Sequence, residues 1–114
     1  MKYTASIYSE EILKDINKYK IIISEKEKNI NFLKEYCIKD DERKNKIYSL
    51  NKKCFVEKII NKDNRIKSKY LYIFSPMYFL TTSYGKEELV KLYIKICRID
   101  DYIYVESFHK DSDY

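Results

Sequence analysis

The 114-residue sequence contains no tryptophan, one glycine, one proline and one histidine. So little glycine and proline argues against a flexible interdomain linker and against a glycine-rich loop that would bind phosphate. The three cysteines, Cys37, Cys54 and Cys97, are widely spaced and include no CxxC pair, which indicates neither a disulfide framework nor a zinc site. We expect reduced, mostly buried thiols, no bound metal and no cofactor.

Long hydrophobic runs are also missing. No segment approaches the roughly 18 to 20 consecutive apolar residues that cross a bilayer, and Met1 to Thr4 lead into charged residues rather than into the apolar stretch of a signal peptide. We therefore expect a soluble, cytoplasmic protein with no membrane partner. With 45% hydrophobic and 36% charged residues, the sequence predicts one buried core and a single domain over residues 1–114.

Positive charge and tyrosine are present in excess. Twenty-three Lys and Arg face eighteen Asp and Glu, a net charge of +5, and this favours a polyanionic partner such as RNA. Several of the 13 tyrosines alternate with lysines, as in Lys91, Tyr93 and Lys95. In such a pattern the rings can stack on unpaired bases while the cations contact phosphates. The same composition also fits a protein from an AT-rich genome whose tyrosines serve mainly as strand residues.

Helical periodicity dominates about residues 9–60, which predicts three helices separated by a short β-branched run at Ile21–Ile23. The first is expected to run from Ser9 to about Tyr19, the second to begin at a Ser24–Glu27 capping box, and the third to begin at Asp40 or Asp41. The residues expected on the inner faces are Ile12, Leu13, Ile16, Ile30, Leu33, Tyr36 or Cys37, Ile47, Leu50 and Phe55.

From Lys69 onward the period becomes two, which predicts strands. The predicted strands are Tyr70–Phe74, Met77–Thr82, Glu88–Ile99 and Tyr102–His109, with turns at Ser83–Lys86 and Asp100–Asp101. Helices that precede strands are typical of the α+β class. We expect N-terminal helices packed on one face of a C-terminal antiparallel sheet of three to five strands, over about residues 69–109.

The turn at Asp100–Asp101 predicts a register for the last two strands. A two-residue turn would place Lys95 opposite Glu106, Tyr93 opposite Phe108 and Cys97 opposite Tyr104, all on one face. The residues expected on the other face, as a core under the helices, are Val90, Leu92, Ile94, Ile96, Ile103 and Val105. His109 would lie on the face opposite Tyr93, so a site that contains both requires a β-bulge near Ser107 or a different turn.

Three residues of this hairpin form a candidate catalytic set for RNA cleavage without a metal. The reaction needs a group that activates the ribose 2′-hydroxyl, cations that stabilise the charged phosphorane and an acid for the leaving oxygen. His109 is the only histidine, and the ordinary pKa of histidine lies near neutrality. Tyr93 and Lys95 point the same way from one strand and offer a phenol and an ammonium. The alternatives are an exposed histidine without a role and a cross-strand Lys95–Glu106 ion pair.

Several segments resemble the MqsR family of toxins. Residues 92–96, Leu-Tyr-Ile-Lys-Ile, and residues 105–109, Val-Glu-Ser-Phe-His, are similar to the family's last two strands, in which Tyr-Ile-Lys is followed by Ser-Phe-His or Ser-Phe-Lys. Residues 23–29 resemble its helix with a Lys-Asn pair, residues 50–58 its Leu-to-Asp-Phe segment, and residues 70–74 its aromatic middle strand. Over about residues 9–110 there are three departures: Cys54 stands at a usually acidic position, Lys58 is displaced by one, and Leu71 replaces a glutamine of some members.

The resemblance implies a RelE-like fold and an endoribonuclease that cuts messenger RNA and is neutralised by a protein antitoxin. The leading hypothesis has Tyr93, Lys95 and His109 as catalytic residues. The expected substrate contacts are Lys26, Lys28, Lys58, Lys69 and Tyr70. One alternative is a non-enzymatic, phage-encoded inhibitor or binding protein that acts on a host defence or nucleic-acid-handling complex. Another is an inert descendant of the toxin fold that keeps only its partner surface.

Overall fold

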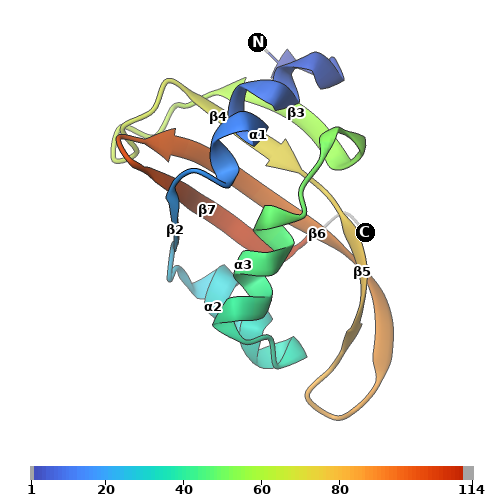
Figure 1. The fold of residues 1–114 in the computed structure, drawn as a ribbon. Helices are drawn as coiled ribbons and strands as arrows, with labels where there is room; N and C mark the ends of the chain where they lie inside the picture. Colours follow the sequence, from blue (N-terminus) through green and yellow to red (C-terminus); the bar gives the residue numbers. More distant parts are fainter. Residues whose placement is uncertain (1, 112–114) are drawn as a thin grey trace.

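A computed structural model describes residues 2–111 of the protein (Figure 1). Within this range the chain has the α+β fold that the sequence predicted, with helices before most of the strands. The helices are α1 (Glu10–Ile16), α2 (Glu27–Tyr36) and α3 (Asp40–Tyr48), with short 3-10 helices η1 (Ser6–Ser9) and η2 (Lys52–Cys54). The strands are β1 (Lys2–Tyr3), β2 (Lys20–Ile23), β3 (Phe55–Ile60), β4 (Tyr70–Phe74), β5 (Met77–Thr81), β6 (Glu87–Ile99) and β7 (Tyr102–Lys110).

The strands form a seven-stranded sheet in the order β1-β3-β4-β6-β7-β2, and β5 pairs with the first part of β6. β2 runs parallel to β7, whereas the other pairs are antiparallel. The predicted sheet of three to five antiparallel strands was therefore too small and missed the parallel pair. β2 coincides with the β-branched run that was expected to separate two helices. β3 lies inside the range that was predicted to be helical, and a register shift between Phe55 and Glu57 interrupts its period of two.

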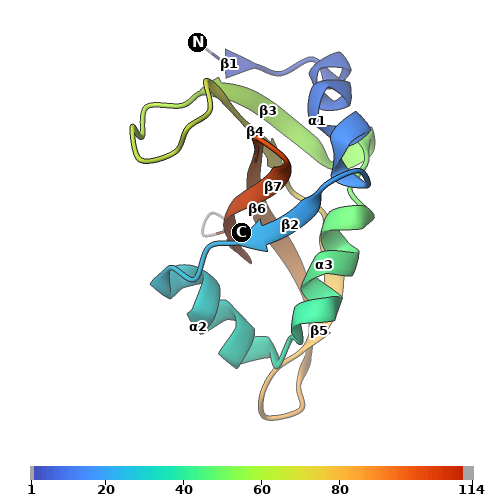
Figure 2. The ribbon, with the colours of Figure 1, turned by 60° about the vertical axis from the view of Figure 1, so that its left-hand side comes forward.

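All three helices contribute to one core on one face of the sheet, as predicted, and Figure 2 shows α1 and α3 along the same side. The core residues of the helices are Ile12, Ile16, Phe32, Tyr36 and Ile47, and those of the strands include Phe74, Val90, Leu92, Ile94, Ile96, Ile103, Val105 and Phe108. The predicted core face of the β6–β7 hairpin is thus confirmed. So is its two-residue turn, because Ile99 pairs with Tyr102 and Asp100 adopts a positive φ of 51°.

Helix boundaries were predicted less well. α1 ends at Ile16, short of Tyr19. The expected capping box does not form, since α2 begins at Glu27 and Ser24 Oγ instead accepts a hydrogen bond from the Lys26 N–H at 3.3 Å. Ile30 was expected on the inner face of α2, but the structure buries the residue before it, the polar Asn29. Phe55, expected on the third helix, lies in β3.

The face of the sheet away from the helices, which we call the open face, is only partly covered. Leu71, Ile73 and Cys97 are buried there, outside the main core. The loop of residues 61–69 between β3 and β4 is ordered by Asn61, whose Nδ2 donates to three carbonyl oxygens of that loop at 2.7 to 3.0 Å. Of the three cysteines expected to be mostly buried, Cys97 is buried, Cys54 is half-buried and Cys37 is exposed.

Candidate active site

A β-bulge in β7 decides which side chains share the open face. The pairing between β6 and β7 shifts by one residue between Lys95 and Ile96, which makes Glu106 the extra residue of β7. A bulge of this kind reverses the alternation of the residues that follow it. Lys95 consequently pairs with Ser107, and the bulge-free register, which placed Glu106 opposite Lys95, was wrong.

The bulge also brings Tyr93 and His109 together. His109 pairs with Tyr93, in the place that the bulge-free register gave to Phe108. The two rings stack with their centroids 5.6 Å apart and their planes 27° apart, while Phe108 is buried in the helix-facing core. Of the two predicted ways to bring both residues onto one face, a bulge near Ser107 or a different turn, the structure has the bulge.

Asn29 of α2 bonds backbone groups of β7 at and just after the bulge, beyond the end of the pairing with β2 at Val105. Its Nδ2 donates to the carbonyl oxygens of Ser24 at 2.9 Å and Glu106 at 3.2 Å, and its Oδ1 accepts from the Phe108 N–H at 2.8 Å. The Asn29 side chain is fully buried, so these backbone groups have no ready access to water. Asn29 therefore stabilises the bulge and, through it, the position of His109.

Replacing Asn29 with alanine is expected to lower the free energy of unfolding by roughly 1 to 3 kcal/mol, because the buried Phe108 N–H loses its partner, and the part-buried Glu106 carbonyl adds a smaller loss. Urea denaturation measures the change. Asn31→Ala is the matched control, since Asn31 is exposed on the same helix. Equal stability of the two variants would show that other contacts hold the bulge.

Five residues predicted from the sequence line one pocket on the open face. The pocket has a volume of about 360 Å³ and is bordered by Lys26, Lys28, Tyr93, Lys95, Ser107, His109 and Asp111. All three predicted catalytic residues, Tyr93, Lys95 and His109, line this pocket. Two of the predicted substrate contacts, Lys26 and Lys28, line it as well. The pocket therefore combines an imidazole, a phenol and three ammonium groups.

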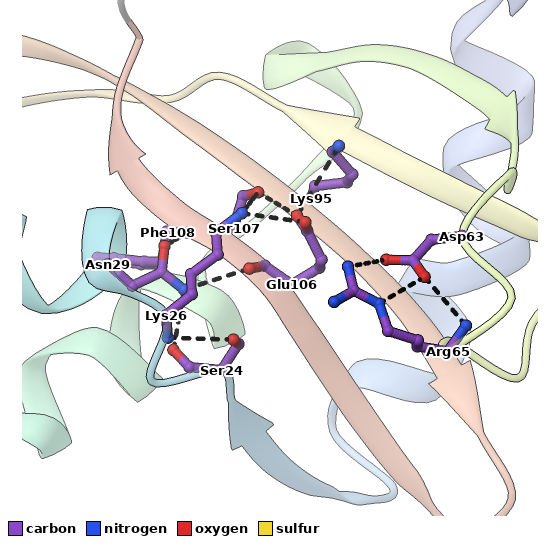
Figure 3. A network of polar contacts seen from close by, with 9 residues as sticks. All are labelled: Ser24, Lys26, Asn29, Asp63, Arg65, Lys95, Glu106, Ser107 and Phe108. Atoms are coloured by element: carbon purple, nitrogen blue, oxygen red, sulfur yellow. Dashed lines mark hydrogen bonds and ion pairs between the residues drawn. The ribbon is translucent and has the colours of Figure 1, made fainter.

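Glu106 lies between two of these lysines (Figure 3). Its carboxylate accepts a hydrogen bond from Lys26 Nζ at 3.0 Å and lies 3.8 Å from Lys95 Nζ. Lys26 Nζ also donates to Ser107 Oγ at 2.9 Å, and the Ser107 hydroxyl donates to the Glu106 carboxylate. Burial opposes ionisation of Glu106, but the hydrogen bonds from Ser107 and Lys26 and the charge of Lys95 lower its pKa overall. The network therefore holds the two ammonium groups beside Glu106, at the border of the pocket.

The two aromatic rings of the pocket have pKa values shifted in opposite directions. Burial lowers the pKa of His109, and the charges of Lys26 and Lys28 lower it further, against a hydrogen bond to the Lys110 carbonyl oxygen that raises it. Burial and the nearby charge of Glu106 raise the pKa of Tyr93. At neutral pH the imidazole is therefore mainly neutral and can accept a proton, and the phenol is protonated and can donate one.

Lys58 and Tyr70 lie on the helix-facing side, apart from this pocket. Lys58 is buried and forms an ion pair with Glu11 of α1 at 2.6 Å. Its Nζ lies 4.0 Å from the centre of the Tyr70 ring, and the next tyrosine rings, at 5.1, 5.3 and 5.9 Å, are those of Tyr3, Tyr8 and Tyr72. Lys69 is exposed beside Tyr70, with 5.4 Å from its Nζ to the ring centre. The structure thus does not bring these three predicted substrate contacts to the pocket.

Three polar residues of the site had no predicted role in it. Asn29 appeared only as part of a Lys-Asn pair, Glu106 only as an ion-pair partner of Lys95, and Ser107 only as the position of a bulge. The apolar residues Val105 and Phe108 of β7 are three apart, whereas an unbroken strand requires an even spacing on one face; this indicates a bulge but does not identify its extra residue.

No family model, curated protein or solved structure matches this chain. Among residues 2–111 no helix has the length and apolar character needed to cross a membrane. The same residues contain no group of three or more His, Cys, Asp or Glu side chains arranged to hold a metal ion. The function of the pocket therefore has to follow from the chemistry of its own side chains.

Proposed function

We propose that the protein is a cytoplasmic endoribonuclease that cleaves messenger RNA without a metal ion and that a protein antitoxin neutralises, as the resemblance to MqsR toxins implies. One observation carries the proposal: the bulge in β7 places His109, Tyr93 and Lys95 in a single pocket with Lys26 and Lys28. These side chains provide a base, an acid and a set of cations, which are the groups that RNA cleavage through the 2′-hydroxyl requires.

His109 and Tyr93 act as the base and the acid of this mechanism. His109 accepts the proton of the ribose 2′-hydroxyl as the 2′-oxygen attacks the adjacent phosphorus. The bond from phosphorus to the 5′-oxygen of the next nucleotide then breaks, and the Tyr93 hydroxyl donates a proton to that oxygen. The products are a 2′,3′-cyclic phosphate and a 5′-hydroxyl end. Solvent returns the proton from His109 to Tyr93.

Lys26 and Lys95 stabilise the negative charge that builds up on the phosphorane. Their side chains are 34% and 21% exposed, so a phosphate can reach both without a change of fold. Glu106 holds the two ammonium groups in position before the substrate arrives, which reduces the reorganisation that the reaction needs. Lys28, exposed at the rim, attracts the RNA backbone.

The pH dependence of cleavage follows from the lowered pKa of His109. Because the base must be neutral, kcat/KM is expected to fall only as the pH drops below about 6.5, the ordinary pKa of histidine. Lys28→Gln removes one of the charges that lower this pKa and is expected to move the acid limb toward neutrality. Initial rates on a short RNA between pH 4.5 and 8 measure both profiles. An acid limb that lies above pH 7 in the parent protein would contradict the assignment of His109 as the base.

Expression in a bacterium tests the proposed function in cells. Induction is expected to arrest growth and to produce new RNA 5′ ends within messenger RNAs, while a His109→Ala protein that accumulates equally produces neither. Normal growth and intact transcripts at high expression of the parent protein would overturn the ribonuclease proposal.

A non-enzymatic binding protein is the second candidate, and one surface favours it. Met77, Phe79 and Leu89 on one side of the β5–β6 hairpin are 45%, 69% and 45% exposed, and Phe79 pairs directly with Leu89. Exposed apolar patches often bind other proteins, whether an antitoxin or a host target. If the protein acts by binding alone, Phe79→Ser removes its effect in cells and His109→Ala does not.

A further inference from the structure

A second cavity lies beside the candidate active site on the open face. It has a volume of about 380 Å³, and its lining includes Lys26, Arg65, Tyr102, Tyr104 and Glu106. Lys26 and the Lys26–Glu106 ion pair at 3.0 Å stand between this cavity and the catalytic pocket, because Lys26 borders both. A strand of RNA whose phosphate contacts Lys26 therefore has a neighbouring nucleotide within reach of the second cavity.

The side chains of this cavity are suited to a flat ring. Tyr102 and Tyr104 are half-buried residues of β7, and they precede the bulge. Arg65 comes from the loop between β3 and β4, where its Nε and Nη2 donate to the two carboxylate oxygens of Asp63 at 3.0 and 2.9 Å (Figure 3). This paired bond orients the guanidinium group at the rim of the cavity, where 86% of the Arg65 side chain is exposed. Guanidinium planes and tyrosine rings both stack on unpaired bases.

Charge makes the cavity better suited to a base than to a phosphate. Glu106 and Asp63 both line it, and Arg65 holds the pKa of Asp63 at about 2, so that this carboxylate is ionised. Lys26 and Arg65, which also line the cavity, are paired with these carboxylates, so the cavity has no excess positive charge to attract a phosphate, whereas the N–H groups of a neutral base can donate to the carboxylate oxygens. The volume is sufficient for one nucleobase with part of its ribose.

We propose that this second cavity, the Tyr104 pocket, binds one nucleobase of single-stranded RNA, that of a nucleotide next to the phosphate held by Lys26. The proposal rests on the proposed ribonuclease function and names how that site selects and positions its substrate. Tyr104 is a positioning residue in this account, because it binds a base without touching the reacting phosphate.

Binding of short RNA tests the proposal separately from cleavage. Fluorescence anisotropy is measured with labelled single-stranded oligoribonucleotides of 2′-O-methyl nucleotides, which lack the attacking hydroxyl. Tyr104→Ala is expected to weaken binding by about 5- to 150-fold, the range found when one stacked base loses its aromatic partner. Tyr104→Phe keeps the ring and is expected to bind within a factor of about 3 of the parent protein. Tyr84→Ala is the matched control, since Tyr84 is 84% exposed at the tip of the β5–β6 hairpin.

A set of oligonucleotides with one abasic position each identifies the base that is bound. One abasic position is expected to weaken binding by the parent protein as much as Tyr104→Ala does, and to have no further effect on the Tyr104→Ala protein, because both changes remove the same contact. Equal loss at that position in both proteins would overturn the proposal, as would parent-like binding by Tyr104→Ala or no binding of single-stranded RNA by the parent.

If the parent protein cleaves RNA but Tyr104→Ala binds normally, the base pocket is refuted and the ribonuclease proposal stands. If the parent protein binds RNA through Tyr104 but never cleaves it, the ribonuclease proposal is refuted and the base pocket stands.

Discussion

Replacing His109 with alanine is expected to slow RNA cleavage by about 100- to 10,000-fold, the usual effect of removing a general base. The imidazole is the only side chain of the pocket that can exchange a proton near neutral pH without a large pKa shift. Its stacking on Tyr93 and its place near the end of β7 leave the core residues untouched. The rate is measured with a fluorogenic RNA under single-turnover conditions, which isolate the chemical step from product release.

Stability controls accompany this variant. Circular dichroism and urea denaturation should show His109→Ala to be folded, because the side chain is only partly buried. Lys110→Ala is the neighbouring control, since Lys110 is exposed and its backbone carbonyl, which accepts from His109, is unchanged. If the folded His109→Ala protein cleaves as fast as its parent, His109 is not the base, and another group of the parent protein must accept the proton.

Lys95→Ala is expected to reduce the cleavage rate on the order of 100-fold, with a smaller effect on binding, because a group that stabilises the transition state contributes mainly to the chemical step. Lys69→Ala removes the same charge from an exposed lysine outside the pocket and controls for the general attraction of RNA. Comparison of single-turnover rates and of RNA affinity in the two variants separates the effects. Similar losses in both would show that overall charge, and not the position of Lys95, supports cleavage.

The two substitutions are expected not to be additive. His109 and Lys95 serve one transition state and lie in one pocket, so the double variant should lose less than the product of the two single losses. Full additivity would indicate that the residues act in separate steps.

The core of the hairpin could be predicted from the sequence, but the bulge could be inferred only as a requirement. Val90, Leu92, Ile94 and Ile96 alternate without interruption and are all fully buried, which is why the face of β6 was predicted correctly. Alternation does not locate the residue at which a strand changes phase. In β7 that residue is fixed by Asn29, whose bonds to the bulge come from a helix 77 and 79 residues away in the chain. No local pattern contains that information.

A second irregularity decides on which face Lys58 lies, a residue that was expected at the site from the resemblance alone. The pairing of β3 with β4 shifts between Phe55 and Glu57, so the phase of β3 changes at Val56. Lys58 then pairs with Tyr72 and points toward Glu11 of α1, whereas an unbroken strand would place it on the face opposite Phe55. One bulge thus brings His109 onto the open face and the other removes Lys58 from it.

The most direct test of the proposed chemistry is cleavage of an RNA in which one ribose at a mapped cleavage site is replaced by 2′-deoxyribose. We expect the purified protein to cut the all-ribose RNA in the presence of a chelator, to leave a 2′,3′-cyclic phosphate and a 5′-hydroxyl end, and not to cut at the deoxy position. His109→Ala protein purified in the same way controls for contaminating ribonucleases. Cleavage that persists at the deoxy position, or that leaves a 5′-phosphate, would contradict attack by the 2′-hydroxyl and with it the roles given to His109 and Tyr93.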